Sequence, residues 1–178
     1  MKTYVAAALL ATLGAACQSA VRESGRAESL VATAALQPTQ GSKAFGEATF
    51  EQSGSGRVHL SVNAQGLKPG SEHGFHIHEV GDCSSGDGMS AKGHFNPAAK
   101  PHGNPASPEH HAGDLPALKA DKSGRARLEA ELDGVTLAPG PNSIVGRAVI
   151  IHADPDDYTT QPTGNSGARL ACGVIKAS

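Results

Sequence analysis

The feature of this chain that most constrains its fold is a series of short runs in which apolar and polar residues alternate. Residues 44–52 and 57–64 alternate in this way, and the loop Ser53-Gly54-Ser55-Gly56 separates them. Alternation with a period of two is typical of a strand with one buried face, and the glycine-containing loop predicts a hairpin. Further strands are predicted at 73–79, 115–120, 125–132, 148–152 and 168–175.

The segments between these runs favour turns and loops rather than helices. No window of ten or more residues keeps a helical period, and the 178 residues include 22 glycines and 11 prolines. Short, regularly spaced strands predict an all-β sandwich or barrel. Residues 81–113 and 154–167 lack strand character and are rich in histidine, aspartate, proline and glycine. Loops of this length in a compact domain are usually functional, so we expect them to carry the site.

The first residues have the pattern of an export signal. Lys2 precedes an apolar run from Val5 to Ala16, which is shorter than the roughly 20 residues that span a bilayer. The sequence therefore predicts a signal peptide over residues 1–16 and an exported protein of the periplasm or cell envelope. Residues 17–40 are mostly small and polar, and we expect a flexible lead-in or tether there, followed by one folded domain over residues 41–178.

The chain has three cysteines, Cys17, Cys83 and Cys172. LGAAC, which ends at Cys17, resembles a bacterial lipobox, in which the cysteine is lipidated and anchors the protein to a membrane. Gly14 stands where that pattern prefers Leu, Val or Ile, and the alternative is an ordinary cleaved signal with an incidental cysteine. Export implies an oxidising compartment, and Cys83 and Cys172 are the natural disulfide pair in the body of the protein. Closing a loop of about 90 residues is worth about 4–5 kcal/mol in the chain-entropy model.

The charge and the aromatic content exclude one class of partner. The formal net charge is -2, tryptophan is absent, and Phe and Tyr are few. A chain with neither a basic patch nor a stacking platform is not expected to bind nucleic acid.

The histidines suggest a metal site. His76 and His78 flank Ile77, and in a strand they point to the same face, where they can converge on one ion. This pair alone also fits a half-exposed strand that carries two imidazoles. The first long loop adds candidate ligands, and a further histidine ends the apolar run AVIIH. Imidazoles together with one carboxylate are a suitable set of ligands for zinc. These further candidates are His94, His102, His111, Asp114 and His152.

Five motifs in order, GFHIHEVGDC, GHFNP, HHAGDLP, IIHADPDD and GNSGARLACGVI, resemble the copper,zinc superoxide dismutase family over roughly residues 43–176. The resemblance implies an all-β fold, an eight-stranded Greek-key β-barrel or sandwich with two long functional loops. It also implies an enzyme that dismutates superoxide to oxygen and hydrogen peroxide with copper beside a structural zinc, and so protects the cell envelope. The alternative is a non-enzymatic periplasmic copper carrier or buffer on the same fold. A homodimer is compatible with the family, but no interface can be inferred.

The resemblance also implies individual roles. The copper ligands would be His76, His78, His94 and His152, and the zinc ligands His94, His102, His111 and Asp114. His94 would bridge the two ions and help to deliver a proton. Asp156 would join the outer ring nitrogens of His76 and His102. Arg169 would guide and hold superoxide, and Cys83 with Cys172 would form the disulfide of the family.

Two features remain outside this pattern. The stretch 154–167 lacks the Glu-Glu-x-x-Lys pattern that steers substrate in many eukaryotic relatives, which leaves Lys92, beside GHFNP, as a candidate steering charge. The other histidines, His59, His73 and His110, are expected to be structural or solvent-facing.

Overall fold

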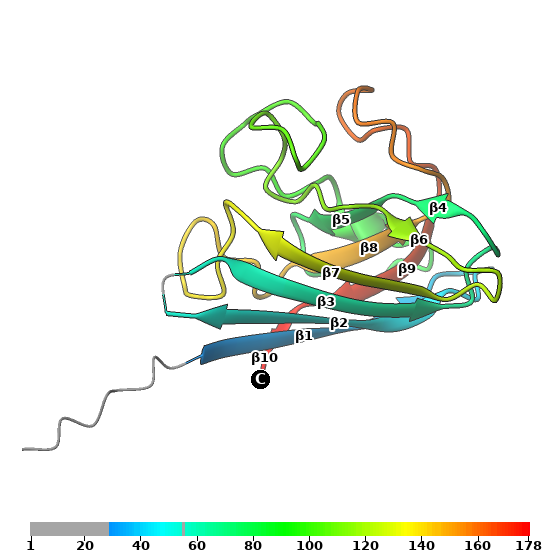
Figure 1. The fold of residues 1–178 in the computed structure, drawn as a ribbon, viewed down its shortest axis with the longest axis horizontal. Helices are drawn as coiled ribbons and strands as arrows, with labels where there is room; N and C mark the ends of the chain where they lie inside the picture. Colours follow the sequence, from blue (N-terminus) through cyan, green and yellow to red (C-terminus); the bar gives the residue numbers. More distant parts are fainter. Residues whose placement is uncertain (1–28, 55) are drawn as a thin grey trace, which may run out of the picture.

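The computed structural model describes residues 29–54 and 56–178, which form an almost entirely β-structured domain (Figure 1). Within these residues the only helix is a short 3-10 turn, η1 (Met89–Ala91). The strands are β1 (Ser29–Pro38), β2 (Phe45–Ser53), β3 (Val58–Gln65), β4 (Glu72–His73), β5 (Phe75–His78), β6 (Leu118–Lys119), β7 (Ala126–Leu132), β8 (Ala148–His152), β9 (Arg169–Val174) and β10 (Lys176–Ala177).

The strands form a curled antiparallel sheet in the order β5-β8-β9-β1-β2-β3-β7, with β10 also paired to β1 and with β4 and β6 forming a separate pair. Strands β5 and β8 are neighbours although β6 and β7 lie between them in the sequence, and such a long return connection is typical of a Greek key. The expected all-β barrel is therefore confirmed. The expected strands at 73–79 and 115–120 are shorter than predicted, because 73–79 divides at Gly74 and 115–120 reduces to β6.

The expected start of the folded domain, near residue 41, is wrong. Residues 29–38 were expected to belong to the lead-in, but they form β1, which pairs with β2, β9 and β10. The buried side chains of β1 are Ala32, Ala34 and Leu36, whereas Leu30 is exposed. Alanine gives a weak hydrophobic signal, so the alternation was not evident in the sequence. The signal peptide, Cys17 and the rest of the lead-in lie outside the described residues.

The pairing of β5 with β8 determines which side chains face the site. Phe75 lies opposite Ile151 and Ile77 opposite Val149, and all four belong to the main hydrophobic core. Because neighbouring strand residues point to opposite faces, His76 and His78 project away from this core. They share their face with the end of β8, which carries His152.

The two long loops leave this region of the barrel on the same side (Figure 1). The first connects β5 to β6 and the second connects β8 to β9, which confirms the two long loops expected from the sequence. Among the described residues, no helix has the length and apolar character needed to cross a membrane.

Candidate metal centre

The backbone brings the first loop against β5 at two points. Isolated β-bridges pair His78 with His94 and His76 with Asp114, all of which are buried. Two residues of a strand and two residues of the loop therefore lie beside each other, although Asp114 is 36 positions further along the chain than His78.

A glycine allows this close approach. Ile77 N donates a hydrogen bond to Gly113 O (2.8 Å), and Phe95 N donates to Ile77 O (2.8 Å). Gly113 N in turn donates to Phe95 O (2.9 Å). A Cβ atom at Gly113 would lie 2.2 Å from Ile77 O, so a larger residue here would separate the three segments.

The first cluster consists of four buried imidazoles whose ligand atoms lie within 4.8 Å of one another, those of His76, His78, His94 and His152. His78 Nδ1 donates to Lys92 O (2.8 Å), which leaves Nε2 directed inward, 3.3 Å from Nε2 of His152. His76 Nδ1 and His94 Nε2 are buried and form no hydrogen bond with any described residue. Buried polar atoms are normally paired, so these inward nitrogens fit a bound metal ion.

Burial keeps these rings in the form that binds metal. Burial lowers the pKa of His78 and His152 well below the usual value, and the other histidines of the cluster lower it further. The neutral imidazole is the ligand form, so the first cluster is ready to bind a cation without releasing protons from these two rings.

The second cluster consists of three imidazoles and one carboxylate, those of His94, His102, His111 and Asp114. Oδ1 of Asp114 lies 2.9 Å, 3.0 Å and 3.5 Å from the Nδ1 atoms of His94, His102 and His111. Ligands about 2.0–2.1 Å from a tetrahedral zinc ion are about 3.3 Å apart, so this donor set fits zinc. Asp114 is itself held by backbone N–H groups of Gly103 and His111, which donate to Oδ2 at 3.1 Å and 2.8 Å.

His94 belongs to both clusters. Its Nδ1 atom faces Asp114 and its Nε2 atom faces the rings of the first cluster. Burial lowers the pKa of His94 to about 4 even though Asp114 acts in the opposite direction. One imidazole therefore separates two adjacent groups of donors, and each of its nitrogens is directed at one group.

Asp156, from the second loop, connects the clusters on their outer side. Its Oδ2 atom lies 2.6 Å from His76 Nε2, and its Oδ1 atom lies 2.9 Å from His102 Nε2. Burial opposes ionisation, but hydrogen bonds from His102 and His76 hold the pKa of Asp156 well below its usual value. Gly164 has φ +66°, and a Cβ atom there would lie 1.9 Å from Asp156 Oδ1. The second loop therefore needs glycine at this position to keep the bridge.

Arg169 and a disulfide hold the remaining side of the first loop. Cys83 and Cys172 form the disulfide expected from the sequence, with Cα atoms 5.8 Å apart. Arg169, at the start of β9, donates one hydrogen bond to Gly88 O (2.7 Å) and another to Lys92 O. Lys92 O therefore accepts from both Arg169 and His78, which places the guanidinium next to the first cluster.

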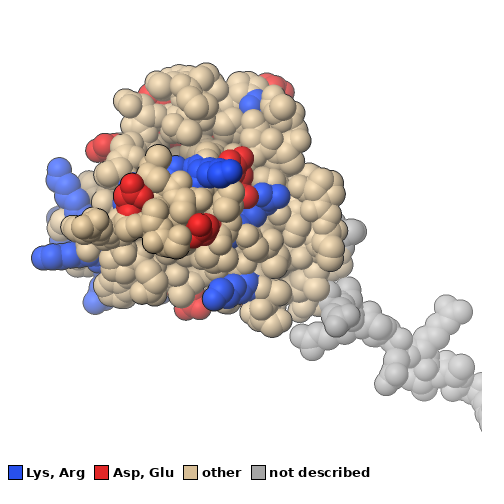
Figure 2. Space-filling model, turned by 180° about the vertical axis from the view of Figure 1, so that it is seen from behind, with Lys and Arg blue, Asp and Glu red and all other residues tan. Residues whose placement is uncertain are grey.

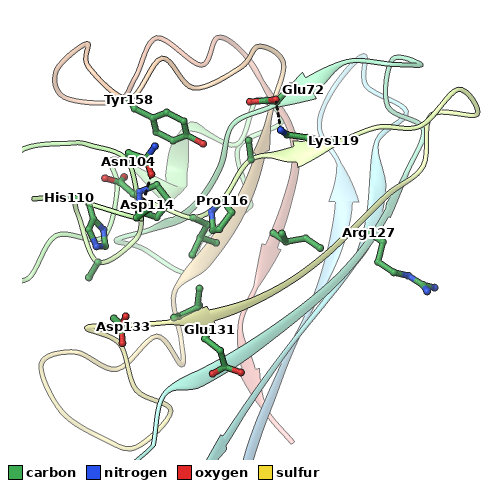
Figure 3. Close-up of a pocket in the computed structure, with 17 residues that line it drawn as sticks. Glu72, Asn104, His110, Asp114, Pro116, Lys119, Arg127, Glu131, Asp133 and Tyr158 are labelled. Carbon is green, nitrogen blue, oxygen red and sulfur yellow. Dashed lines mark hydrogen bonds and ion pairs between the residues drawn. The ribbon is translucent and has the colours of Figure 1, made fainter. Parts of the chain in front are cut away.

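A groove of about 620 Å³ lies beside the second cluster (Figure 3). Asp114, His110 and Tyr158 line one side of it, and Glu131 and Asp133 line the other. His76, His78 and His152 are not among its lining residues, so it does not lead to the first cluster.

The other histidines lie outside both clusters. His59 is half-buried at the surface and contacts Glu129 and Glu131. His73 donates from Nδ1 to His152 O (2.8 Å), and His110 donates to His111 O. The residue pattern does not reveal the roles of Gly113, Gly164 or the carbonyl of Lys92. A glycine within a motif predicts only weakly that two backbone segments approach each other closely. A carbonyl group that accepts hydrogen bonds is present in every residue, so the type of the residue does not indicate it.

Comparison with known proteins agrees with this geometry. Residues 44–175 match the family described as copper/zinc superoxide dismutase (SODC). The chain is 45% identical over 153 residues to "Superoxide dismutase [Cu-Zn] 2" of Aquifex aeolicus (strain VF5), which covers 84% of this chain and 88% of the relative. A second superoxide dismutase [Cu-Zn] of that organism is 44% identical over 136 residues, covering 74% and 80%.

Solved structures give the same result. The clock protein EA4 superposes with a TM-score of 0.74 at 41% identity and covers 82% of this chain and 93% of its own. A SOD-like protein from Bacillus subtilis superposes with a TM-score of 0.72 at 39% identity, covering 79% and 95%. From the matched motifs, the barrel and the paired clusters, we conclude that this chain belongs to the copper/zinc superoxide dismutase family.

Proposed function

We propose that this protein dismutates superoxide, with copper in the first cluster and zinc in the second. The observation that carries this proposal is the sharing of His94 between a set of four imidazoles and a set that contains a carboxylate. Four imidazoles suit copper, and a tetrahedral set with a carboxylate suits zinc. The names of the Aquifex aeolicus relatives support the same activity.

When bound, copper supplies one-electron redox chemistry, which oxidises one superoxide to oxygen and reduces a second one to hydrogen peroxide, while zinc is redox-silent. The residues of this chain provide binding and proton transfer. Arg169 binds the anion through charge-assisted hydrogen bonds, and its orientation is set by the carbonyls of Gly88 and Lys92. His94 Nε2, the atom on the side of the first cluster, would hold a proton only when it does not bind copper, and would deliver that proton to the reduced product; solvent would supply the second proton of hydrogen peroxide.

The test is to load the mature protein with copper and zinc and to measure superoxide decay together with metal content. We expect fast decay only in the form that holds both metals. A protein that binds both metals but is no faster than its zinc-only form would contradict the proposal. Arg169→Ala should slow superoxide decay while both metals stay bound, because Arg169 supplies no metal-binding atom to either cluster.

A non-enzymatic copper carrier or buffer is the second candidate. The burial of all four rings of the first cluster argues for retention of copper rather than transfer. Rapid copper transfer to a chelator, combined with no superoxide decay, would support the carrier instead.

We also propose that the protein is exported and protects the cell envelope. The signal-like residues 1–16 support export, and the disulfide between Cys83 and Cys172 suits an oxidising compartment. Lipidation of Cys17 would anchor the protein to a membrane, and Cys17→Ser should then release it to the soluble fraction. A wild-type protein that is already soluble would overturn the anchor. A homodimer stays a prediction, which light scattering of the mature protein can measure.

A further inference from the structure

His102 differs from the other residues of the two clusters in how its backbone is held. Five of the seven residues lie in strands or in isolated β-bridges, namely His76, His78, His94, Asp114 and His152. His111 lies outside these elements, but its backbone N donates to Asp114 Oδ2 (2.8 Å) and its O accepts from Asp114 N (3.1 Å), within its own loop. His102 also lies outside them, and its backbone groups take part in no backbone–backbone hydrogen bond with any described residue.

The side chain of Gln161, in the second loop, bonds to both backbone groups of His102. Its Oε1 atom accepts from His102 N (2.8 Å), and its Nε2 atom donates to His102 O (2.9 Å). Nε2 also lies 3.4 Å from Thr159 O. Two residues 59 positions apart are therefore joined by a pair of hydrogen bonds, like two directly opposed residues of an antiparallel sheet.

The second loop presents Gln161 and Asp156 to the same histidine. Asp157 N donates to Gly164 O (3.0 Å), so the turn that carries Gln161 is closed, and Asp156 directly precedes it. Asp156 contacts the ring of His102 at Nε2, whereas Gln161 contacts its backbone. One turn of the second loop therefore fixes both the ring and the backbone of His102.

This double attachment matters because a metal ion binds most tightly to ligands that are already in place. A ligand that is fixed in advance loses little further conformational freedom when the ion binds. Outer hydrogen bonds that orient a ligand typically change metal affinity about 10–100-fold. The side chain of Gln161 is exposed, so water can replace its amide, and we expect its loss to affect the position of His102 more than the stability of the fold.

We propose that Gln161 is a positioning residue for the second cluster, whose side-chain amide fixes the backbone of His102 so that its ring stays directed at zinc. Gln161 belongs to neither cluster and supplies no metal-binding atom. It acts together with Asp156, which holds the outer nitrogen of the same ring. This inference rests on the proposed function, since zinc is taken to be the ion of the second cluster.

Four substitutions of glutamine separate positioning from general stability. Gln161→Met keeps the length of the side chain and removes the amide, whereas Gln161→Asn keeps the amide but is too short to reach both backbone groups. Gln65→Met is the control for an exposed glutamine. Gln52→Met is the control for an amide that holds backbone elsewhere, because Gln52 contacts Gly56 O (2.8 Å) and Leu137 N (2.8 Å), outside both long loops.

None of these substitutions changes a charge. On the face drawn in Figure 2, positive and negative side chains are interspersed, and all four variants keep this pattern. A change in metal binding therefore reports on contacts and not on long-range attraction.

Each protein is loaded with copper and zinc, and the rate at which each metal is lost to an excess of chelator is measured. We expect Gln161→Met and Gln161→Asn to lose zinc about tenfold faster than the wild type, and copper no more than about twofold faster. Gln65→Met should match the wild type. Gln52→Met should lower the Tm without changing the rate of zinc loss.

Hydrogen exchange of the His102 amide, followed by NMR in the zinc-only form, tests the contact itself. We expect exchange about fivefold faster in Gln161→Met and Gln161→Asn, because the amide loses its acceptor, and no change in Gln52→Met.

Zinc loss at the wild-type rate in Gln161→Met would overturn the inference, even if the His102 amide exchanges faster. So would equal acceleration for both metals, or acceleration of zinc loss by Gln52→Met to the same extent, because either result would indicate general loosening of the fold. None of these measurements uses superoxide. If the wild type shows no superoxide decay but zinc loss depends on Gln161, the proposed function fails while the positioning role stands.

Discussion

The first and second clusters share His94 but offer different atoms to a metal ion. The first offers four ring nitrogens, and burial lowers the pKa of His78 and His152 well below its usual value. In the second, burial acts on His102 in the same direction, but Asp114 and Asp156 outweigh it and raise the pKa of His102 to about 9. The pKa values of these buried imidazoles are therefore shifted in opposite directions, because His102 contacts two carboxylates.

The two clusters also differ in how the chain holds them. The first loop is tied beside the first cluster by a disulfide and by the hydrogen bonds of Arg169. The second cluster is held by the carboxylate of Asp114, which accepts from two backbone N–H groups. A covalent link supports the first site and the carboxylate of Asp114 supports the second, so substitutions at these two supports should affect the sites separately.

The largest effect is expected for Asp114→Asn. This change removes the only negative charge among the donors of the second cluster, and we expect zinc to bind more than 100-fold more weakly. Copper content should change little, because Asp114 contributes no atom to the first cluster. Metal content after dialysis against a chelator measures both, with the exposed Asp133→Asn as the control. Zinc binding at wild-type affinity in this variant would contradict the view that the carboxylate of Asp114 distinguishes the second cluster from the first.

The double variant Cys83→Ser with Cys172→Ser tests the covalent support. We expect the free energy of unfolding to fall by about 2–5 kcal/mol, because the unfolded chain gains freedom when a long loop is opened. Urea denaturation of the metal-free protein measures this change. Copper affinity should fall more than zinc affinity, since the disulfide and Arg169 tie the first loop to β9 beside the first cluster. An equal fall for both metals would show that the disulfide supports the barrel as a whole.

Asp156→Asn should weaken both sites together. Its carboxylate contacts His76 of one cluster and His102 of the other, and loss of such an outer contact typically lowers metal affinity about 10–100-fold. Competition with a chelator for each metal measures the change. Asp157→Asn is the neighbouring control, because Asp157 is exposed and its carboxylate accepts hydrogen bonds only from Thr159 and Thr160. A decrease for one metal alone would mean that Asp156 does not couple the clusters.

The smallest effect is expected for His59. It tests whether a contact between histidine and carboxylate contributes less to stability at the surface than in the buried clusters. A hydrogen bond to Glu131, opposed by slight burial and helped by Glu129, raises the pKa of His59 above 6.5 at the surface. Its contribution to stability is therefore complete below pH 6.5 and is lost as the pH rises through the raised pKa. Relative to His59→Gln, we expect wild type to be more stable at pH 5.5 than at pH 8 by less than about 1 kcal/mol. A difference that survives 0.5 M salt would contradict a screened surface pair.

Much of the candidate site could be predicted because its signals are local. The two-residue spacing of His76 and His78 places them on one face in any strand, and β8 has the predicted bounds, 148–152. Residues 81–113 and 154–167 were identified as loops by composition alone. The order of five motifs then linked distant segments through a family resemblance, which the family match confirms.

The sequence by itself determined the strand faces, the types of the donor atoms and the loops that carry them, because these depend on neighbours along the chain. Only the tertiary structure decided that residues 29–38 form a strand in the middle of the sheet. Their partners β9 and β10 lie at the other end of the chain, and their buried alanines have little hydrophobic signal. The tertiary structure also decided that one carbonyl, that of Lys92, serves both His78 and Arg169. Every residue has a carbonyl, so its role depends on where the chain brings it and cannot be inferred from the side chain.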